Sequence, residues 1–232
     1  EQHAGLISGF QRSGTMVIAA NHGGGFWPED PDGVHNYGRV DASGDEAGEG
    51  FLESDYGRDF NADGDTSDTM SFDETLVSWG SSILDDALSD IIGEVDLSYG
   101  RMIIVMEQCF SGGLIEELSQ PGRDTIIMAA ADELEPSYAK APDYDYNEFC
   151  YHVTCAMNGA DHDGNAVDAD ADDDGRVSLL EVFNYARAQD GASETPQYED
   201  NGDGTPSTGE IVPLGAGTEG YLGSRTWLSG FD

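Results

Sequence analysis

The chain has 232 residues, and its 47 Asp and Glu against 9 Lys and Arg give a formal net charge of −38 at pH 7. This charge excludes nucleic acids and anionic membrane surfaces as partners, because phosphates would be repelled over most of the molecule. The 38% of hydrophobic residues include no apolar run near the roughly 20 residues that cross a bilayer, so we expect no membrane span. Such an acidic composition is typical of proteins from saline settings and of proteins that bind divalent cations.

The first third of the chain contains one apolar segment, one acidic segment and one segment with helical periodicity. Residues 15–20 are apolar and precede a run of glycines, which predicts a buried strand that ends in a glycine-rich loop. Residues 28–73 are rich in Asp, Glu and Gly and cannot bury a core of their own, so we expect an acidic insertion. Apolar residues at helical spacing predict an amphipathic helix over 74–95, or a helix pair broken near Gly80.

The remaining chain alternates between apolar strands and helices. We predict buried strands at 101–106 and 125–130, a helix that starts at 114–118, and further helices at 148–157 and 177–188. Strands that are apolar throughout and alternate with helices form a parallel sheet with both faces covered. The predicted fold class is therefore α/β, with a mainly parallel sheet.

The sequence predicts one domain, 1–232, with an acidic insertion at 28–73 and a calcium-loop region at 160–212. The chain begins with Glu1 instead of Met and shows no signal-peptide pattern. We therefore expect the C-terminal portion of a larger, processed chain.

Cys109 and His22 each follow one of the predicted buried strands. Ligands of such sheets bind at the carboxyl ends of the strands, so we expect the two side chains to meet there. Cys109 also precedes a helix, whose dipole is expected to favour the thiolate and lower the thiol pKa. The arrangement predicts a nucleophile and a general base, with the backbone N–H groups of Gly23 and Cys109 stabilising the oxyanion.

Three segments in this order resemble a known family. They are MVIAANHGG at 16–24, IIVMEQCFSGG at 103–113 and IIMAAADELEPSYA at 126–139. Together they resemble the legumain-like cysteine peptidases of the caspase-like clan. Microbial members of this group also resemble the chain in its later Asp-rich loop and helix.

The resemblance covers about residues 15–157 and implies a caspase-like three-layer sandwich with cysteine endopeptidase activity. It implies a catalytic dyad of His22 and Cys109, and it places Glu107 and Ser137 in the substrate pocket. The residue preferred at the cleaved position stays open between Asn, Asp and a basic residue. In this clan further strands precede the histidine strand, so we expect these N-terminal strands to be missing here, and a companion chain is a possible partner that supplies them.

The segment 170–181 matches the twelve-residue EF-hand calcium loop in spacing and residue type. Gly175 permits the sharp turn, and a helix is predicted directly afterwards. The expected Ca²⁺ ligands are the side chains of Asp170, Asp172 and Asp174, the carbonyl of Arg176, a water held by Ser178, and both oxygens of Glu181.

Two weaker copies of this loop occur. One comprises Asp59, Asn61, Asp63 and Asp65, and the other comprises Glu199, Asn201, Asp203 and Glu210. Met70 replaces the bidentate acid in the first copy, and Pro206 argues against a following helix in the second. The three loops are far apart in the chain, so we expect structural calcium rather than a paired sensor.

The three cysteines predict no disulfide, because Cys150 and Cys155 lie five residues apart in a predicted helix and point away from each other. Calcium loops of this kind act where calcium is millimolar. We therefore expect an extracellular or cell-surface protein, from a prokaryote in a saline setting. His35 and His152 are expected to be surface or packed residues.

Two functions from different classes are compatible with these features. The first is a calcium-stabilised cysteine endopeptidase that cleaves peptide or protein substrates. The alternative is a catalytically silent, calcium-dependent structural or adhesive subunit that keeps the caspase-like fold. A reactive Cys109 with a low pKa is expected only of the first.

Overall fold

A computed structural model describes most of the chain after residue 100 and shorter parts before it. The described residues are 14–19, 22–25, 39–40, 51–52, 54, 57, 64–67, 69–70, 72–78, 81–94, 101–119, 122–143 and 145–227.

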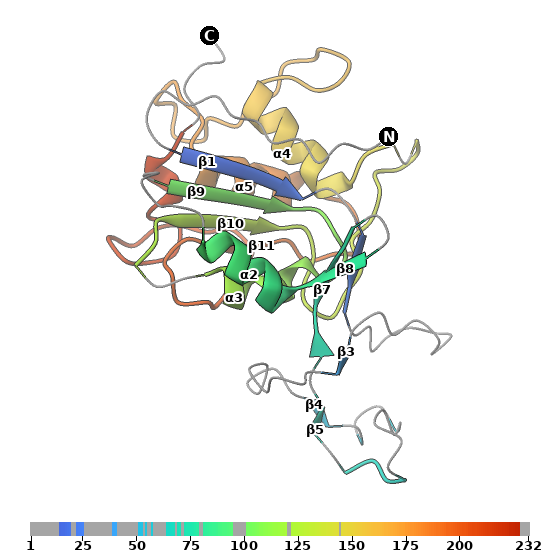
Figure 1. The fold of residues 1–232 in the computed structure, drawn as a ribbon. Helices are drawn as coiled ribbons and strands as arrows, with labels where there is room; N and C mark the ends of the chain where they lie inside the picture. The colour runs from blue at the N-terminus through green and yellow to red at the C-terminus, as the bar shows by residue number, and fades with distance from the viewer. Residues whose placement is uncertain are drawn as a thin grey trace.

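A five-stranded sheet with the order β1-β9-β10-β11-β12 forms the centre of the fold (Figure 1). Its strands are β1 (Gly14–Ala19), β9 (Arg101–Met106), β10 (Thr125–Ala129), β11 (Gln197–Glu199) and β12 (Ser207–Thr208). The first three strands are parallel, and the last two join antiparallel. The three predicted strands and their parallel pairing are confirmed, whereas β11 and β12, which pair antiparallel, were not predicted.

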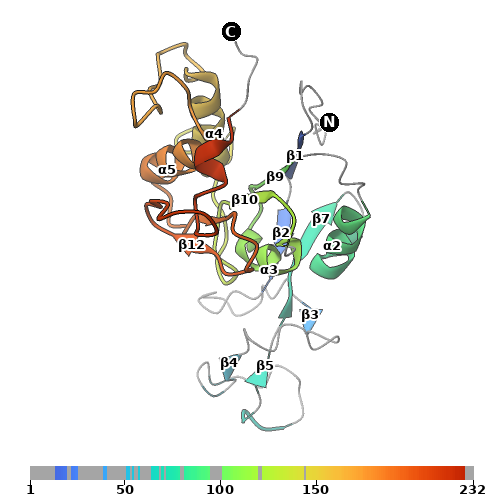
Figure 2. The same ribbon diagram turned by 90° about the vertical axis from the view of Figure 1, so that its left-hand side faces the viewer.

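Helices cover both faces of this sheet, because successive side chains of β9 point to opposite faces and are apolar on both. Ile103 and Val105 point into a core shared with α4 and α5, whereas Met102, Ile104 and Met106 point into a second core shared with α2 and α3. The helices are α2 (Asp85–Gly93), α3 (Ile115–Leu118), α4 (Glu148–Asn158) and α5 (Leu179–Gln189). Figure 2 shows α4 and α5 on one side of the sheet and α2 on the other. Each fully buried aliphatic side chain contributes about 1.5–3 kcal/mol, which explains why strands buried on both faces are apolar throughout.

The boundaries of α4 and α5 follow local capping signals. Asn147 caps α4 by accepting a hydrogen bond from a backbone N–H, and Gly159, with φ of 66°, ends the helix in the left-handed region. Ser178 and Glu181 form a capping box at the start of α5. The helices predicted at 148–157 and 177–188 are confirmed. Among the described residues, no helix has the length and apolar character needed to span a bilayer.

The helix predicted over 74–95 is wrong in its first half. The structure has a hairpin there, β7 (Thr75–Ser78) with β8 (Ser81–Leu84), and only α2 is helical. Leu76 and Ile83, which contributed to the helical spacing, instead lie opposite each other across the hairpin. The segment contains β-branched residues, which are compatible with strands, but the pairing of β7 with residues 22–24 is what outweighs the helical spacing.

The hairpin extends into a second sheet with the order β2-β7-β8, in which β2 (His22–Gly24) pairs with β7. The glycine-rich loop predicted after residue 20 is therefore a strand in this part of the chain. His22, three residues after the end of β1, is thus held in place by the backbone pairing of β2 with β7.

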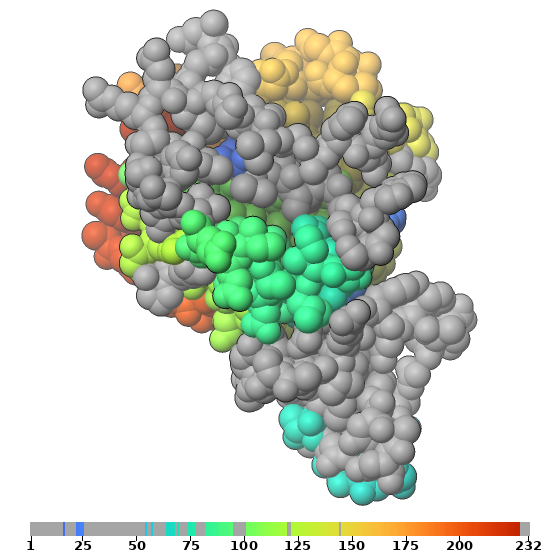
Figure 3. Space-filling view, viewed as in Figure 1, coloured from blue at the N-terminus to red at the C-terminus, as the bar shows by residue number. Residues whose placement is uncertain are grey.

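Within the predicted acidic insertion, short strands pair in two antiparallel ladders. These are β3 (Arg39–Val40) with β6 (Phe72–Asp73), and β4 (Phe51–Leu52) with β5 (Thr69–Met70). Figure 1 shows β4 and β5 set apart from the main sheet, and in the space-filling view of Figure 3 the cyan atoms of this segment also lie away from the green atoms of α2. Much of 28–73 lies outside the described residues, including His35, Asp59, Asn61 and Asp63.

Candidate active site

The register of the parallel strands places His22 and Cys109 at one edge of the sheet. Ala19, the last residue of β1, pairs with Met106, the last residue of β9. His22 and Cys109 each follow their paired strand end by three residues. The two side chains therefore leave the sheet at the same level, on neighbouring strands.

Gly23 brings the two segments into direct contact. A Cβ at Gly23 would overlap the carbonyl oxygen of Cys109 and would lie 3.0 Å from Cγ of Gln108. A Cβ at Gly25 would lie 2.7 Å from Cβ of Phe110. Glycine is required at both positions because the backbone of the histidine segment lies against the cysteine segment.

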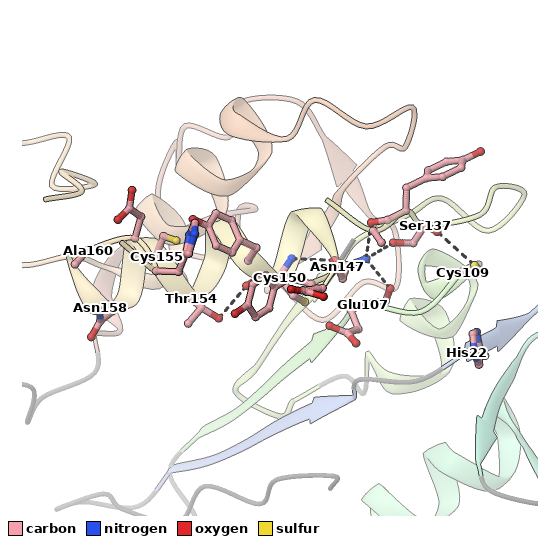
Figure 4. Close-up of a pocket in the computed structure, with 17 residues that line it drawn as sticks. His22, Glu107, Cys109, Ser137, Asn147, Cys150, Thr154, Cys155, Asn158 and Ala160 are labelled. Atoms are coloured by element: carbon pink, nitrogen blue, oxygen red, sulfur yellow. Dashed lines mark hydrogen bonds between the residues drawn. The ribbon is translucent and has the colours of Figure 1, made fainter. Parts of the chain in front are cut away.

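A pocket of about 680 Å³ opens beside these residues. Figure 4 shows His22 and Cys109 at one end of this pocket, and the pocket extends along α4 to Asn158 and Ala160. Glu107 and Ser137 also line it, as the sequence resemblance implies. The structure therefore brings the predicted dyad and the predicted pocket residues together in one cavity.

Cys109 is partly buried, and its Sγ donates a hydrogen bond of 3.7 Å to the carbonyl oxygen of Ser137. Burial raises the pKa of the Cys109 thiol. The expectation that a helix dipole lowers this pKa is therefore wrong for this structure. The chain after Cys109 forms the 3₁₀ turn η2 (Ser111–Leu114) and then α3, which has four residues, so the dipole next to the thiol is short.

The pocket residues beside Cys109 are held by hydrogen bonds to one another. Burial also raises the pKa of Glu107, which is half-buried. The side chain of Asn147 donates to Oγ of Ser137 at 2.5 Å and to the carbonyl oxygen of Glu107 at 3.1 Å. The loops that follow β9 and β10 are thereby joined next to the thiol.

The comparison with protein families decides to which family the chain belongs. The sequence model of the Peptidase C13 family matches residues 68–205, which is more than half of the chain. The chain belongs to the Peptidase C13 family. The matched range includes Glu107, Cys109 and Ser137, whereas His22 precedes it. No curated protein matches the chain.

Membership in the Peptidase C13 family makes the chain a legumain-like cysteine peptidase, as the sequence resemblance predicted, and proteins are its expected substrates. Its three cysteines are free thiols, of which Cys150 and Cys155 are buried on α4. Of the three, Cys109 alone follows a strand end next to the segment that carries His22.

One acidic residue of the C13 peptidase site was missed by sequence reasoning. Glu194 accepts a hydrogen bond of 2.6 Å from the backbone N–H of Tyr138, next to Ser137. Burial, together with the charge of Asp190, raises the pKa of Glu194 to about 8. The residue belongs to no motif and reaches the site only through the fold, so the sequence offered no signal for it.

His152 is a packed residue, as predicted. It is buried on α4, where its Nε2 lies 3.3 Å from Nζ of Lys140 and 3.9 Å from Oε1 of Glu148. Burial and the charge of Lys140 lower the pKa of His152. The imidazole therefore serves packing between α4 and the segment that carries Lys140.

The loop 170–181 of the C13 peptidase has the geometry of a cation site. Side-chain oxygens of Asp170, Asp172 and Asp174 lie within 4.8 Å of one another. Gly175 has a φ of 83°, which supplies the predicted sharp turn. Oε1 of Glu181 accepts hydrogen bonds from the backbone N–H groups of residues 171 and 172, which brings this carboxylate back to the start of the loop. The residues present fit a calcium ion, since carboxylates converge on a tight turn.

Like charges crowd this loop. A backbone hydrogen bond from Asp174 lowers the pKa of Asp172, but desolvation and the charges of Asp174, Glu181 and Asp170 outweigh it, so the net pKa is raised. A divalent cation would relieve this repulsion.

The loop with Glu199, Asn201, Asp203 and Glu210 is arranged differently from the prediction. Glu199 is buried, and its Oε1 accepts hydrogen bonds from the N–H groups of Gly202 and Asp203. Glu210 is exposed, and no helix directly follows it, as Pro206 suggested. Instead, the carboxylate of Glu219 reaches this loop by accepting a hydrogen bond of 2.7 Å from the N–H of Asp200.

Of the predicted ligands in the remaining loop, Asp65 is the one that lies among the described residues. Its Oδ1 accepts hydrogen bonds from both the N–H and the Oγ of Ser67. Asp59, Asn61 and Asp63 lie outside the described residues.

Proposed function

We propose that the protein is a cysteine endopeptidase in which Cys109 is the nucleophile and His22 is the general base. The observation that carries this proposal is the matched position of the two residues after paired strand ends, with Gly23 packed on the Cys109 carbonyl. The helices on both faces of the sheet support the caspase-like sandwich that the resemblance implies.

In the proposed reaction, Sγ of Cys109 attacks the carbonyl carbon of the cleaved peptide bond. His22 accepts the thiol proton and later donates it to the leaving amine, and water then hydrolyses the thioester. Burial favours the neutral thiol in the free protein, so proton transfer to His22 accompanies the attack. The backbone N–H groups of Gly23 and Cys109 are the proposed donors to the oxyanion. Glu107 and Ser137, which line the pocket, are the proposed contacts for the substrate side chain.

The experiment that tests the dyad is labelling with a thiol-directed peptide electrophile, followed by mass spectrometry of the labelled residue. We expect labelling at Cys109, strongly reduced in His22→Ala, with the buried Cys150 and Cys155 as internal controls. A folded protein that is not labelled at Cys109 would contradict the proposal and favour the structural or adhesive alternative.

Calcium stabilisation is the second part of the proposal. Asp170, Asp172, Asp174 and Glu181 would hold the ion through carboxylate oxygens, with the carbonyl of Arg176 and a water at Ser178. The ion would supply charge neutralisation at the start of α5. The acidic surface together with this loop supports an extracellular or cell-surface location in a saline setting. Calorimetric titration with Ca²⁺ tests this part, and no heat of binding in a folded sample would contradict it.

A further inference from the structure

The side chain of Asn147 links three elements around the proposed nucleophile. Its Oδ1 accepts a hydrogen bond of 2.9 Å from the N–H of Cys150, which caps α4. Its Nδ2 donates to the carbonyl oxygen of Glu107, to Oγ of Ser137 and to the carbonyl oxygen of Tyr138, at 3.1, 2.5 and 3.3 Å. Figure 4 shows Asn147 between Glu107 and Ser137, at the start of α4.

The neighbours fix the orientation of this amide. Reversing it would place an oxygen against the carbonyl oxygens of Glu107 and Tyr138, and would place N–H groups against the N–H of Cys150. Asn147 therefore acts as an acceptor toward the helix and as a donor toward the two loops.

These two loops carry the groups that must be aligned in the proposed reaction. Glu107 precedes Cys109 by two residues on the loop after β9. Ser137, on the loop after β10, accepts the hydrogen bond from Sγ of Cys109 through its carbonyl. The donor side of Asn147 thus fixes the cysteine loop against the Ser137 loop, on the pocket side of the sheet edge.

We infer that Asn147 is a positioning residue that aligns Cys109 with the Ser137 loop, separately from its role as a helix cap. The inference rests on the proposed function of Cys109 as the nucleophile. Asn147 acts through the backbone of Glu107 and the side chain of Ser137, and it touches neither the thiol nor the cleaved bond.

The test uses variants that separate the two sides of the amide. Asn147→Ser keeps a neutral N-cap acceptor for the N–H of Cys150 but is too short to donate to both loops. Asn147→Asp keeps the acceptor and places an oxygen where the donors were. The matched control is Asn184→Ser, since Asn184 on α5 also donates to and accepts from backbone, at Ile211, outside the pocket.

Four quantities are measured for each full-length variant in calcium. They are kcat and KM on a pool of internally quenched peptides that carries every residue at the cleaved position, the rate of Cys109 alkylation by iodoacetamide, and the melting temperature. We expect Asn147→Ser and Asn147→Asp to lose about 10- to 100-fold in kcat, with KM changed less than about threefold. Iodoacetamide should still alkylate Cys109 in both, but at a rate that differs from the rate in wild type and in Asn184→Ser. Asn184→Ser should lose melting temperature but keep its kcat.

An unchanged kcat in both Asn147 variants would overturn the inference. It would also be overturned if Asn184→Ser lost as much kcat as the Asn147 variants while having the same melting temperature as they do. A wild-type protein that cleaves no peptide in the pool would instead contradict the proposed function. In that case unchanged alkylation rates in both Asn147 variants would also overturn the inference, and changed rates relative to Asn184→Ser would support it.

Discussion

The residue next to the proposed nucleophile has an unusual backbone conformation. Phe110 has a φ of 58°, in the left-handed region, although it is a bulky residue and is buried. Such conformations cost about 1–3 kcal/mol and persist where the surroundings fix them. Here the Phe110 side chain packs against Gly25, and its N–H donates to the carbonyl oxygen of Glu135. Packing from two other segments thus enforces the sharp turn that presents Cys109.

The burial of Cys109 leads to a prediction about its pH dependence. Because burial raises the thiol pKa above its usual value of 9.0, the thiolate is a minor species below that pH in the free protein. The rate of alkylation by iodoacetamide should therefore still rise about tenfold per pH unit at pH 8–9. Stopped assays between pH 6 and 10, with mass spectrometry of the Cys109 peptide, measure this rate. A plateau already reached at pH 7 would show a preformed thiolate and contradict the prediction.

Among the helices and strands, the elements with clear N-cap residues and regular apolar spacing are the ones that the sequence predicts correctly. The helices α4 and α5 begin at Asn147 and Ser178, which are good N-cap residues, and each repeats apolar residues over about three turns. The segment 75–84 has no such cap, and its apolar residues satisfy a helical spacing by chance. Its pairing with β2 decides in favour of strands, and this contact joins residues that are far apart in the chain.

The start of α5 combines helix capping with the proposed calcium loop, and two substitutions separate these roles. Ser178→Ala removes the acceptor for the N–H of Glu181 and should lower the free energy of unfolding by about 1 kcal/mol in chelator, with a smaller further loss in calcium from the missing water ligand. Glu181→Gln can keep the capping box but loses a charged ligand, so it should be nearly neutral in a chelator and should lose most of the stabilisation by calcium.

Urea unfolding of both variants, in calcium and in chelator, measures these effects. Full calcium stabilisation in Glu181→Gln would remove Glu181 from the proposed ligand set. A calcium-dependent loss in Ser178→Ala that far exceeds its loss in chelator would show that Ser178 acts mainly at the ion.

At the scale of the whole molecule, the acidic charge is partly neutralised inside the fold. Burial raises the pKa of Glu133 to about 7 and those of Glu194 and Glu219 to about 8. These three carboxyl groups hold protons near neutral pH. The net charge of −38 counts them as ionised, so the folded protein is less negative than its sequence suggests.

These carboxyl groups predict that stability falls as pH rises. Each has a pKa above its usual 4.5, so its contribution is fully present below about pH 4.5 and is lost as pH rises toward 7 for Glu133 and 8 for Glu194 and Glu219. Asp161, whose pKa is lowered by its hydrogen bonds with Asn165, acts in the opposite direction but is exposed and therefore screened. In chelator, we expect the melting temperature to fall by at least about 5 °C from pH 5 to pH 8.

Calorimetry over this pH range measures the effect, and Glu194→Gln is the informative variant. Its neutral amide cannot titrate, so the dependence on pH should become shallower than in the wild type. A melting temperature that rises from pH 5 to pH 8 in chelator, or a slope unchanged by Glu194→Gln, would contradict the prediction.

The sequence by itself determined the three buried strands, the helices α4 and α5, the order of the His22 and Cys109 segments and the resemblance to legumain-like peptidases. These features depend on local patterns: apolar runs, caps, glycines and fixed spacings. Only the tertiary structure decided the hairpin β7–β8, the burial that raises the pKa of Cys109, and the arrival of Asn147 and Glu194 beside the pocket. Each of these results from contacts between segments that are distant in the chain, and no local pattern encodes such contacts.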